Sequence, residues 1–393
     1  MSSQKFDILS LNVKLISSFP WEGFSMKITA AVALKQGDPL VIKTVNLNSD
    51  LKSDELLVKT VASGICGADV QEINGGPTGF APIPMIMGHE GAGIVESVGS
   101  SVTEFQPGDH VTVSYASCGT CKQCVAGRPY ACERMNELNF GGKDIDGGTR
   151  YELDGQPLSS FFQQSSFGNY MKVQACNVAK VTKDVDLKLL GPLGCGLQTG
   201  AGTVLNDLKP QPGDGIVIFG TGTVGLAAIM AAKVAHCDPI IAVDIVDSRL
   251  DLALELGATN VINSQNTPDV PAEVNKISAG GVEFGVVSAG INGLAENAVR
   301  STSIYGTVAI VGGAFEGKFN LAQDVLIPAR TIRGVLQGSS LPKLFIPKLI
   351  NLYQTGQFPF DELVKFYDLA DINQAIADSK SGKVIKPILI MPE

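Results

Sequence analysis

Residues 215–235 read GIVIFGTGTVGLAAIMAAKVA, and this stretch decides the fold of one half of the chain. A short apolar run leads into Gly220, Gly222 and Gly225, which form a G-x-G-x-x-G pattern, and an apolar segment of helix length follows. Glycines at this spacing allow a tight turn, let a pyrophosphate approach the backbone, and let the helix pack closely on the strand. The helix N-terminus supplies free N–H groups for the anion. The stretch therefore predicts a dinucleotide-binding strand, turn and helix.

The next apolar run, at 240–244, supports this prediction because it ends in an acidic residue. Asp244 stands nineteen residues after Gly225, where a carboxylate binds ribose hydroxyls and repels a 2′-phosphate. Ile245 rather than a basic residue follows it. We therefore expect NAD rather than NADP. Arg249 is close enough in sequence to support the ribose, although an exposed arginine at the start of a helix describes it equally well.

Apolar runs and helical segments alternate from 197 to 339, which favours an α/β fold with a doubly wound parallel sheet. Between 26 and 196, short β-rich runs are separated by glycine and proline, which is typical of a small barrel-like domain. Residues 340–393 are expected to return to that first domain. A length of 393 residues exceeds the roughly 250–300 at which one core stops growing, so two domains are expected. Residues 1–25 form a charged N-terminal extension that makes a poor signal peptide.

The composition excludes several classes of partner. The formal net charge is −9, so no basic surplus is present to neutralise nucleic acid or an anionic membrane surface. No apolar run reaches the roughly 18 residues that span a bilayer. A cytoplasmic protein with a small-molecule substrate is the expectation.

Four of the eight cysteines lie within fifteen residues, at the spacing C-x2-C-x2-C-x7-C. Such a cluster in a long chain indicates metal binding rather than a disulfide framework. Four thiolates close a tetrahedron around Zn²⁺ and leave no open position, so the predicted site is structural and organises a lobe at about 115–135. Its ligands are Cys118, Cys121, Cys124 and Cys132.

A second set of metal-binding residues is dispersed along the chain. Cys66, His89 and Cys195 each stand beside glycines, and two thiolates with one imidazole leave a fourth zinc position open for water or substrate. Asp69 and Glu90 lie next to these residues in sequence and are able to orient the ligands or tune the metal. Spacing alone does not identify this site.

Together these residues make the chain resemble the zinc-containing medium-chain alcohol dehydrogenase family from about Met26 to the C-terminus. Segments such as GPLGCGLQTGAGT at 191–203 and GATNVINS at 257–264 are similar to aryl and benzyl alcohol dehydrogenases. The resemblance implies a GroES-like catalytic domain, a Rossmann domain, two zinc ions per chain, NAD, and a homodimer or homotetramer.

The resemblance also implies roles for individual residues. Cys66, His89 and Cys195 would hold the catalytic zinc, with Glu90 behind it and Asp69 hydrogen-bonded to His89. Further residues are implied at the cofactor and at the substrate. Thr199 and Val224 would press on the nicotinamide, Lys386 would contact the pyrophosphate unless it is merely solvated, and Tyr115 and Leu336 would line the substrate pocket unless they pack in the core.

One residue departs from the family pattern. Ser or Thr normally stands two residues after the first cysteine ligand and passes on the alcohol proton, but here the residue is Ala68, and Gln71 stands where some members carry a histidine. A methyl group neither donates nor accepts a proton. Three readings besides an ordinary alcohol or aldehyde substrate therefore stay open: a 1,4-reductase of a conjugated carbonyl, a zinc lyase or cyclase without net redox change, and a silent dinucleotide-binding scaffold.

Overall fold

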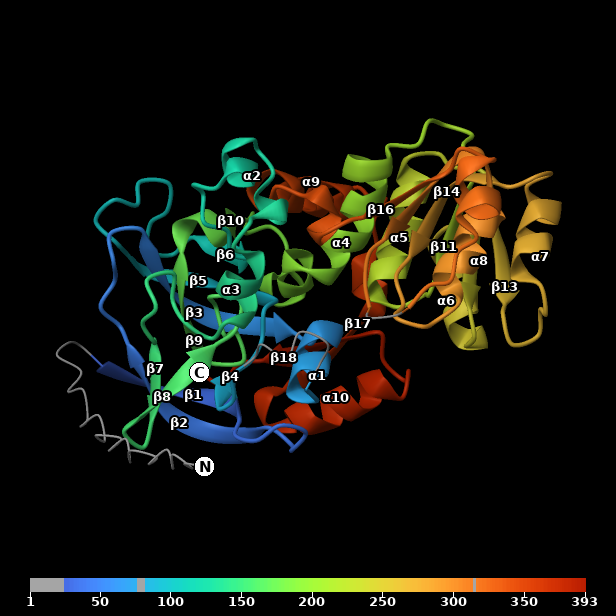
Figure 1. Cartoon of the computed structure of the whole chain (residues 1–393). Helices are drawn as coiled ribbons and strands as arrows, with labels where there is room; N and C mark the ends of the chain where they lie inside the picture. Colours follow the sequence, from blue (N-terminus) through green and yellow to red (C-terminus); the bar gives the residue numbers. More distant parts are fainter. Residues whose placement is uncertain (1–24, 76–81, 314–315) are drawn as a thin grey trace, which may run out of the picture.

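The computed structural model describes residues 25–75, 82–313 and 316–393. The predicted extension at 1–25 therefore lies outside the described residues except for Ser25, which begins the first strand. Figure 1 shows two bodies side by side, a β-rich one and a sheet flanked by helices, with α4 and α9 between them. Within the described ranges, no helix has both the length and the apolar character needed to cross a membrane.

The β-rich body contains two groups of strands. The first is a closed barrel in the order β1-β2-β7-β8-β4. Its strands are β1 (Ser25–Ala33), β2 (Val41–Asn48), β7 (Tyr151–Leu153), β8 (Gln156–Ser160) and β4 (Met85–Ile86). The second is a sheet in the order β10-β6-β5-β3-β18-β17, with β9 paired to β3. Its strands are β10 (Val178–Lys180), β6 (His110–Val113), β5 (Gly91–Val98), β3 (Glu55–Gly64), β18 (Lys386–Ile390), β17 (Val364–Asp368) and β9 (Tyr170–Gln174).

The C-terminal strands belong to this second sheet, because β18 pairs antiparallel with β3 and parallel with β17. The chain thus leaves the β-rich body, builds the other body and comes back. The β-rich body also contains short helices. They are α1 (Gly67–Ile73), α2 (Lys122–Val125), α3 (Met135–Phe140) and α10 (Ile372–Lys380).

The other body is a six-stranded parallel sheet in the order β13-β12-β11-β14-β15-β16. The strands are β13 (Asn260–Asn263), β12 (Ile240–Asp244), β11 (Ile216–Phe219), β14 (Val282–Val287), β15 (Thr302–Ile310) and β16 (Thr331–Gly334). The helices are α5 (Thr223–Val234), α6 (Asp247–Leu256), α7 (Val270–Ile277) and α8 (Leu294–Ser301). This is the 3-2-1-4-5-6 order of the doubly wound dinucleotide fold, so the predicted fold class is confirmed.

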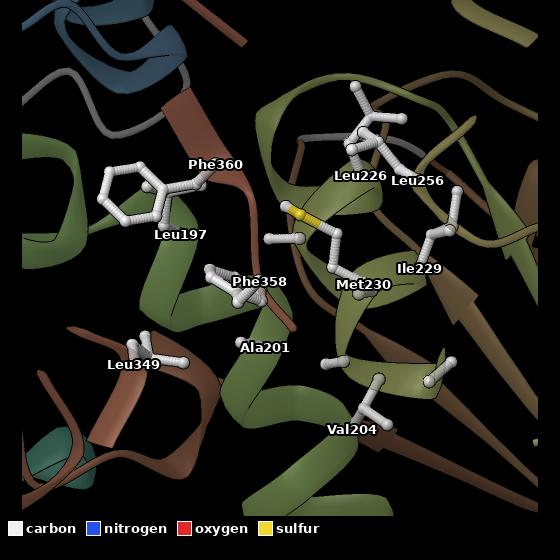
Figure 2. Close-up of a cluster of buried hydrophobic side chains, with 14 of the residues drawn as sticks. Leu197, Ala201, Val204, Leu226, Ile229, Met230, Leu256, Leu349, Phe358 and Phe360 are labelled. Carbon is white, nitrogen blue, oxygen red and sulfur yellow. The ribbon is translucent and has the colours of Figure 1, made fainter. Parts of the chain in front are cut away.

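Two helices join the bodies: α4 (Gly196–Gly202), continued by the π-helical segment Thr203–Leu208, and α9 (Pro342–Gln354). Figure 2 shows Leu197 and Ala201 of α4 in one apolar cluster with Met230 of α5 and Leu349 of α9. The approach is close, since a Cβ on Gly200 would lie 2.0 Å from the carbonyl oxygen of Val224. The helix that begins beside Cys195 is therefore packed directly against the helix that follows the glycine turn.

Candidate metal centres and dinucleotide cleft

The structure brings the dispersed metal-binding residues together. One donor atom from each of Cys66, His89, Glu90 and Cys195 lies within 4.8 Å of the others. Cys66 is the N-cap of α1, His89 and Glu90 precede β5, and Cys195 is the N-cap of α4. Three separate chain segments thus supply two thiols and one imidazole, with a carboxylate beside them.

Asp69 fixes this cluster from one side. Its carboxylate accepts hydrogen bonds from the Cys66 backbone N–H (2.9 Å), the Gly88 backbone N–H (3.1 Å) and Nδ1 of His89 (2.9 Å). The opposite ring nitrogen of His89, Nε2, is buried and has no hydrogen-bond partner among the residues that the structure describes. A buried, unpartnered imidazole nitrogen beside two thiols is the donor set that Zn²⁺ prefers, so these residues fit the metal.

The two thiols titrate differently. The pKa of Cys66 lies well below the ordinary thiol value because Cys195 donates a hydrogen bond to its sulfur, with His89 adding to the effect against the opposing influence of burial. The pKa of Cys195 is raised well above the ordinary value, through its bond to Cys66 and through burial. The hydrogen bond between the two sulfurs therefore favours one thiolate within the pair, and the thiolate is the form that binds a metal.

Glu90 and Lys386 form a buried ion pair behind the cluster. The Nζ atom of Lys386 lies 2.9 and 3.2 Å from the two oxygens of Glu90 and donates to the carbonyl oxygen of Ile65 at 3.0 Å. Lys386 is only 2% exposed, so the alternative interpretation, a merely solvated lysine, is wrong. Burial raises the pKa of Glu90 to about 7 although Lys386 opposes the shift. Contact between Lys386 and a pyrophosphate stays a prediction.

The second cysteine cluster is also assembled. The sulfurs of Cys118, Cys121, Cys124 and Cys132 all lie within 4.8 Å of one another, so the donor set fits a tetrahedral zinc. Backbone N–H groups point at these sulfurs, among them the N–H of Cys121 toward Cys118 (3.3 Å). Burial raises the pKa of Cys118, but such N–H groups outweigh it and lower the pKa to about 6.

Each glycine of the turn after β11 has a distinct geometry. Gly220 has a φ of +93°, which favours glycine strongly. A Cβ on Gly225 would lie 1.8 Å from the carbonyl oxygen of Gly220, so the helix could not pack here with a side chain. A Cβ on Gly222 would meet no described atom within 4 Å. The space above Gly222 is therefore open, as a bound pyrophosphate requires.

A cavity of about 230 Å³ joins this turn to the metal-binding residues. Cys66, Gly222, Val224, Arg249 and Lys386 all line it. Within the described ranges, the buried Nε atom of Arg249 has no hydrogen-bond partner, which suits an anionic ligand. These residues fit a dinucleotide that reaches from the turn to the metal centre.

Two predicted cofactor residues have other contacts. Asp244 lies at the end of β12, and its oxygens accept from the backbone and hydroxyl of Thr221 and from the backbone N–H groups of Ile245 and Val246. Thr199 is 7% exposed in α4, one turn after Cys195, and does not line the cavity. Their contacts with ribose and nicotinamide stay predictions.

The sequence pattern did not identify an aromatic cluster around His89. Phe162 stacks on the imidazole with ring centroids 4.4 Å apart, Phe161 meets it edge-on at 5.4 Å, and Phe140 packs on both rings. Phe162 has a φ of +52°, an uncommon conformation for a bulky residue. The adjacent pair at 161–162 in a chain with only 6% aromatics was the available signal.

Of the two possible pocket residues, Tyr115 is buried and donates from its hydroxyl to the carbonyl oxygen of Ser340 (2.7 Å). Leu336 is 56% exposed, so core packing is wrong for it. Gln337, which follows it, was not predicted. Its Nε2 atom lies 4.0 Å from the sulfur of Cys195.

Comparison with known proteins agrees with this geometry. Residues 52–183 match the model of the alcohol dehydrogenase GroES-like domain, and residues 223–354 match that of the zinc-binding dehydrogenase domain. The chain belongs to the zinc-dependent alcohol dehydrogenase family. As a member of that family it is an oxidoreductase of the alcohol dehydrogenase type, and the family prediction is confirmed.

Several relatives within the family are similar to this chain over most of its length. A geraniol dehydrogenase of Castellaniella defragrans is 37% identical over 372 residues, covering 92% of this chain and 97% of the relative. The crystal structure of benzyl alcohol dehydrogenase from Acinetobacter calcoaceticus is 44% identical with a TM-score of 0.89, covering 93% of this chain and all of that one. The crystal structure of an alcohol dehydrogenase zinc-binding domain protein from Burkholderia ambifaria is 44% identical with a TM-score of 0.90, and the match covers 94% of this chain and all of that one.

Proposed function

We propose that this alcohol dehydrogenase transfers hydride between NAD(H) and a small aromatic or unsaturated alcohol or aldehyde. The observation that carries the proposal is that Cys66 and Gly222 line the same cavity, and that the space above Gly222 is open. A nicotinamide ring and a substrate would have to share such a space for a hydride to pass between them. Two zinc ions per chain, one at each cysteine cluster, are part of the proposal.

Different residues of the chain bind the metal, orient His89 and bind the cofactor in this proposal. Cys66, His89 and Cys195 would hold the catalytic zinc, which when bound supplies Lewis-acid polarisation of the substrate oxygen. Asp69 keeps Nδ1 of His89 hydrogen-bonded, so that Nε2 faces the metal position. The glycine turn would bind NAD, with Asp244 disfavouring a 2′-phosphate by its charge.

An aromatic or unsaturated substrate is supported by the side chains near the metal-binding cluster. Phe162 stacks on the His89 ring and Phe161 meets it edge-on, and both side chains are buried, so the surroundings of this metal-binding residue are apolar and aromatic. The names of the geraniol and benzyl alcohol dehydrogenase relatives agree with this class. The test is a panel of benzylic, allylic and short aliphatic alcohols assayed with NAD and with NADP. A preference for short aliphatic alcohols or for NADP would contradict the proposal.

Ala68 favours a second candidate function, reduction of a conjugated carbonyl at carbon, because no hydroxyl stands at this position to pass on the alcohol proton. Ala68→Thr restores the hydroxyl, and Ala68→Val is its isosteric control without one. If the damaged proton path limits alcohol oxidation, threonine should raise kcat for benzyl alcohol by about tenfold or more, and valine should not. Equal effects of the two variants would argue for the conjugated substrate, which an enal with NADH tests directly.

The two remaining hypotheses, a zinc lyase or cyclase and a silent dinucleotide-binding scaffold, make different predictions. Zinc content and NADH binding without turnover of any alcohol, aldehyde or enal in the panel would favour a scaffold. Consumption of a substrate without change in NADH absorbance would favour a lyase or cyclase.

Association with a second copy of the chain is also part of the proposal. Several large apolar side chains are exposed around the outer edge of the parallel sheet: Ile304, Tyr305, Leu321, Leu326 and Ile327. The edge strand β16 is exposed along its whole length, and such an edge invites pairing. Light scattering of the purified chain should give a homodimer or homotetramer, and a monomer would contradict this. The cytoplasmic location stays a prediction.

A further inference from the structure

A second cavity, separate from the dinucleotide cleft, lies where the cysteine lobe meets the helices that join the two bodies. Its volume is about 710 Å³, and its lining residues belong to the lobe after α2, to the end of the π-helical segment, to β16 and to α9. It shares no lining residue with the cleft at Cys66 and Gly222. Its walls therefore come from both bodies but not from the proposed catalytic site.

The charged residues of this cavity are mostly cationic. Arg128, Lys209, Arg333 and Lys348 line it together with one carboxylate, Asp207. The whole chain carries nine more acidic than basic residues, so this local excess runs against its composition. Lys209 and Lys348 make no ion pair with any residue in the described ranges. Four cations and one carboxylate around the same space leave an excess of positive charge for a ligand.

Both arginines contact a neighbouring side chain through Nε and leave their terminal amino groups available. The Nε atom of Arg128 donates to Oε1 of Gln123 at 2.9 Å. The Nε atom of Arg333 lies 3.1 Å from Oδ1 of Asp207, whose other oxygen accepts a 2.6 Å hydrogen bond from Ser339. In the part of the chain that the structure describes, the terminal amino groups of these two arginines have no partner. A guanidinium oriented through Nε with free terminal N–H groups suits bidentate binding of phosphate or carboxylate oxygens.

Lys209 adds a feature of the backbone. It lies in the left-handed region, with φ +54° and ψ +54°, at the C-terminus of the π-helical segment. Glycine usually occupies this position after a helix, because any other side chain costs energy there. The chain instead carries a cation at this strained position on the cavity wall.

We propose that this cavity binds a small, multiply charged anion of the phosphate or carboxylate class. Arg128 and Lys348 contact it from the β-rich body and α9, and Lys209 and Arg333 contact it from the other body. An anion held between them stabilises the packing of the two bodies on each other, which is a role separate from hydride transfer.

The test is isothermal titration calorimetry with pyrophosphate, performed on the full chain saturated with NADH so that the dinucleotide turn is filled. The variant is Lys209→Gln/Lys348→Gln. The control is Lys35→Gln/Lys276→Gln, which removes the same charge from lysines that are 78% and 77% exposed and lie outside the cavity. We expect one saturable site per chain, and thermal melts should show that filling it raises Tm. The affinity for pyrophosphate should be about tenfold weaker in the variant and should change by less than about twofold in the control.

A second titration with citrate distinguishes the two classes of anionic ligand. Tighter binding of citrate assigns the site to carboxylates, and tighter binding of pyrophosphate assigns it to phosphates. The proposal is overturned if neither anion binds saturably, or if the control loses as much affinity as the variant. Alcohol oxidation by the unliganded protein plays no part in the outcome, so this result is independent of the proposed hydride transfer.

Discussion

Replacing Asp69 by asparagine should weaken zinc binding at the catalytic cluster while leaving the cysteine lobe loaded. One oxygen of Asp69 accepts from His89 and Gly88, and the other accepts from the backbone N–H of Cys66. An asparagine that keeps its oxygen toward His89 must turn its NH₂ group toward the Cys66 N–H, so a donor faces a donor. The negative charge that strengthens the His89 bond is lost at the same time.

Loss of a carboxylate behind a histidine ligand typically weakens metal binding about 10- to 100-fold, or about 1.4 to 2.7 kcal/mol. The assay is competition with a graded zinc chelator, followed by zinc analysis and activity. The wild-type chain should retain two zinc ions at chelator concentrations where Asp69→Asn retains one. Asp38→Asn is the control, because its side chain is 56% exposed and its ion pair with Lys35 spans 3.9 Å. Retention of both ions by Asp69→Asn, with unchanged activity, would refute the reasoning.

Three further predictions follow from other contacts. Arg300 donates two hydrogen bonds of 3.1 Å to Asp324 and holds its pKa below the ordinary carboxyl value, so Asp324 stabilises the fold above about pH 4 and this contribution disappears as the pH falls further. Asp324→Asn should therefore lower the free energy of unfolding by about 1 kcal/mol at pH 7, and urea titrations should show the difference shrinking in acid. Gly225→Ala should cost about 1 to 3 kcal/mol of stability because its Cβ would clash, whereas Gly222→Ala should leave Tm unchanged and weaken NADH binding about tenfold, as fluorescence titration would show. Cys124→Ser should reduce the zinc content from two to one per chain and lower Tm, and an unchanged metal content would contradict a zinc in the lobe.

Local patterns in the sequence predicted much of the architecture. All residues of the glycine turn lie in one short stretch of sequence, and so do all four residues of the cysteine cluster. Their spacing alone therefore restricts the structures and the ligands that each can form or bind. Gly220 and Gly225 illustrate this, because one needs a positive φ and the other contacts a backbone carbonyl of the same turn. The order of apolar runs that begins at 215 likewise predicted a doubly wound sheet, since a parallel strand needs a crossover helix before the next one.

The sequence by itself thus determined the fold class, the cysteine lobe and the family, because short-range spacing and backbone sterics are properties of contiguous residues. Only the tertiary structure decided that Glu90 and Lys386 form a buried pair, that Phe162 stacks on His89, and that cations from both bodies line one cavity. These neighbours are far apart along the chain. Their meeting depends on how the barrel, the sheets and the joining helices pack together, which is a sum of many weak contacts that no local spacing encodes.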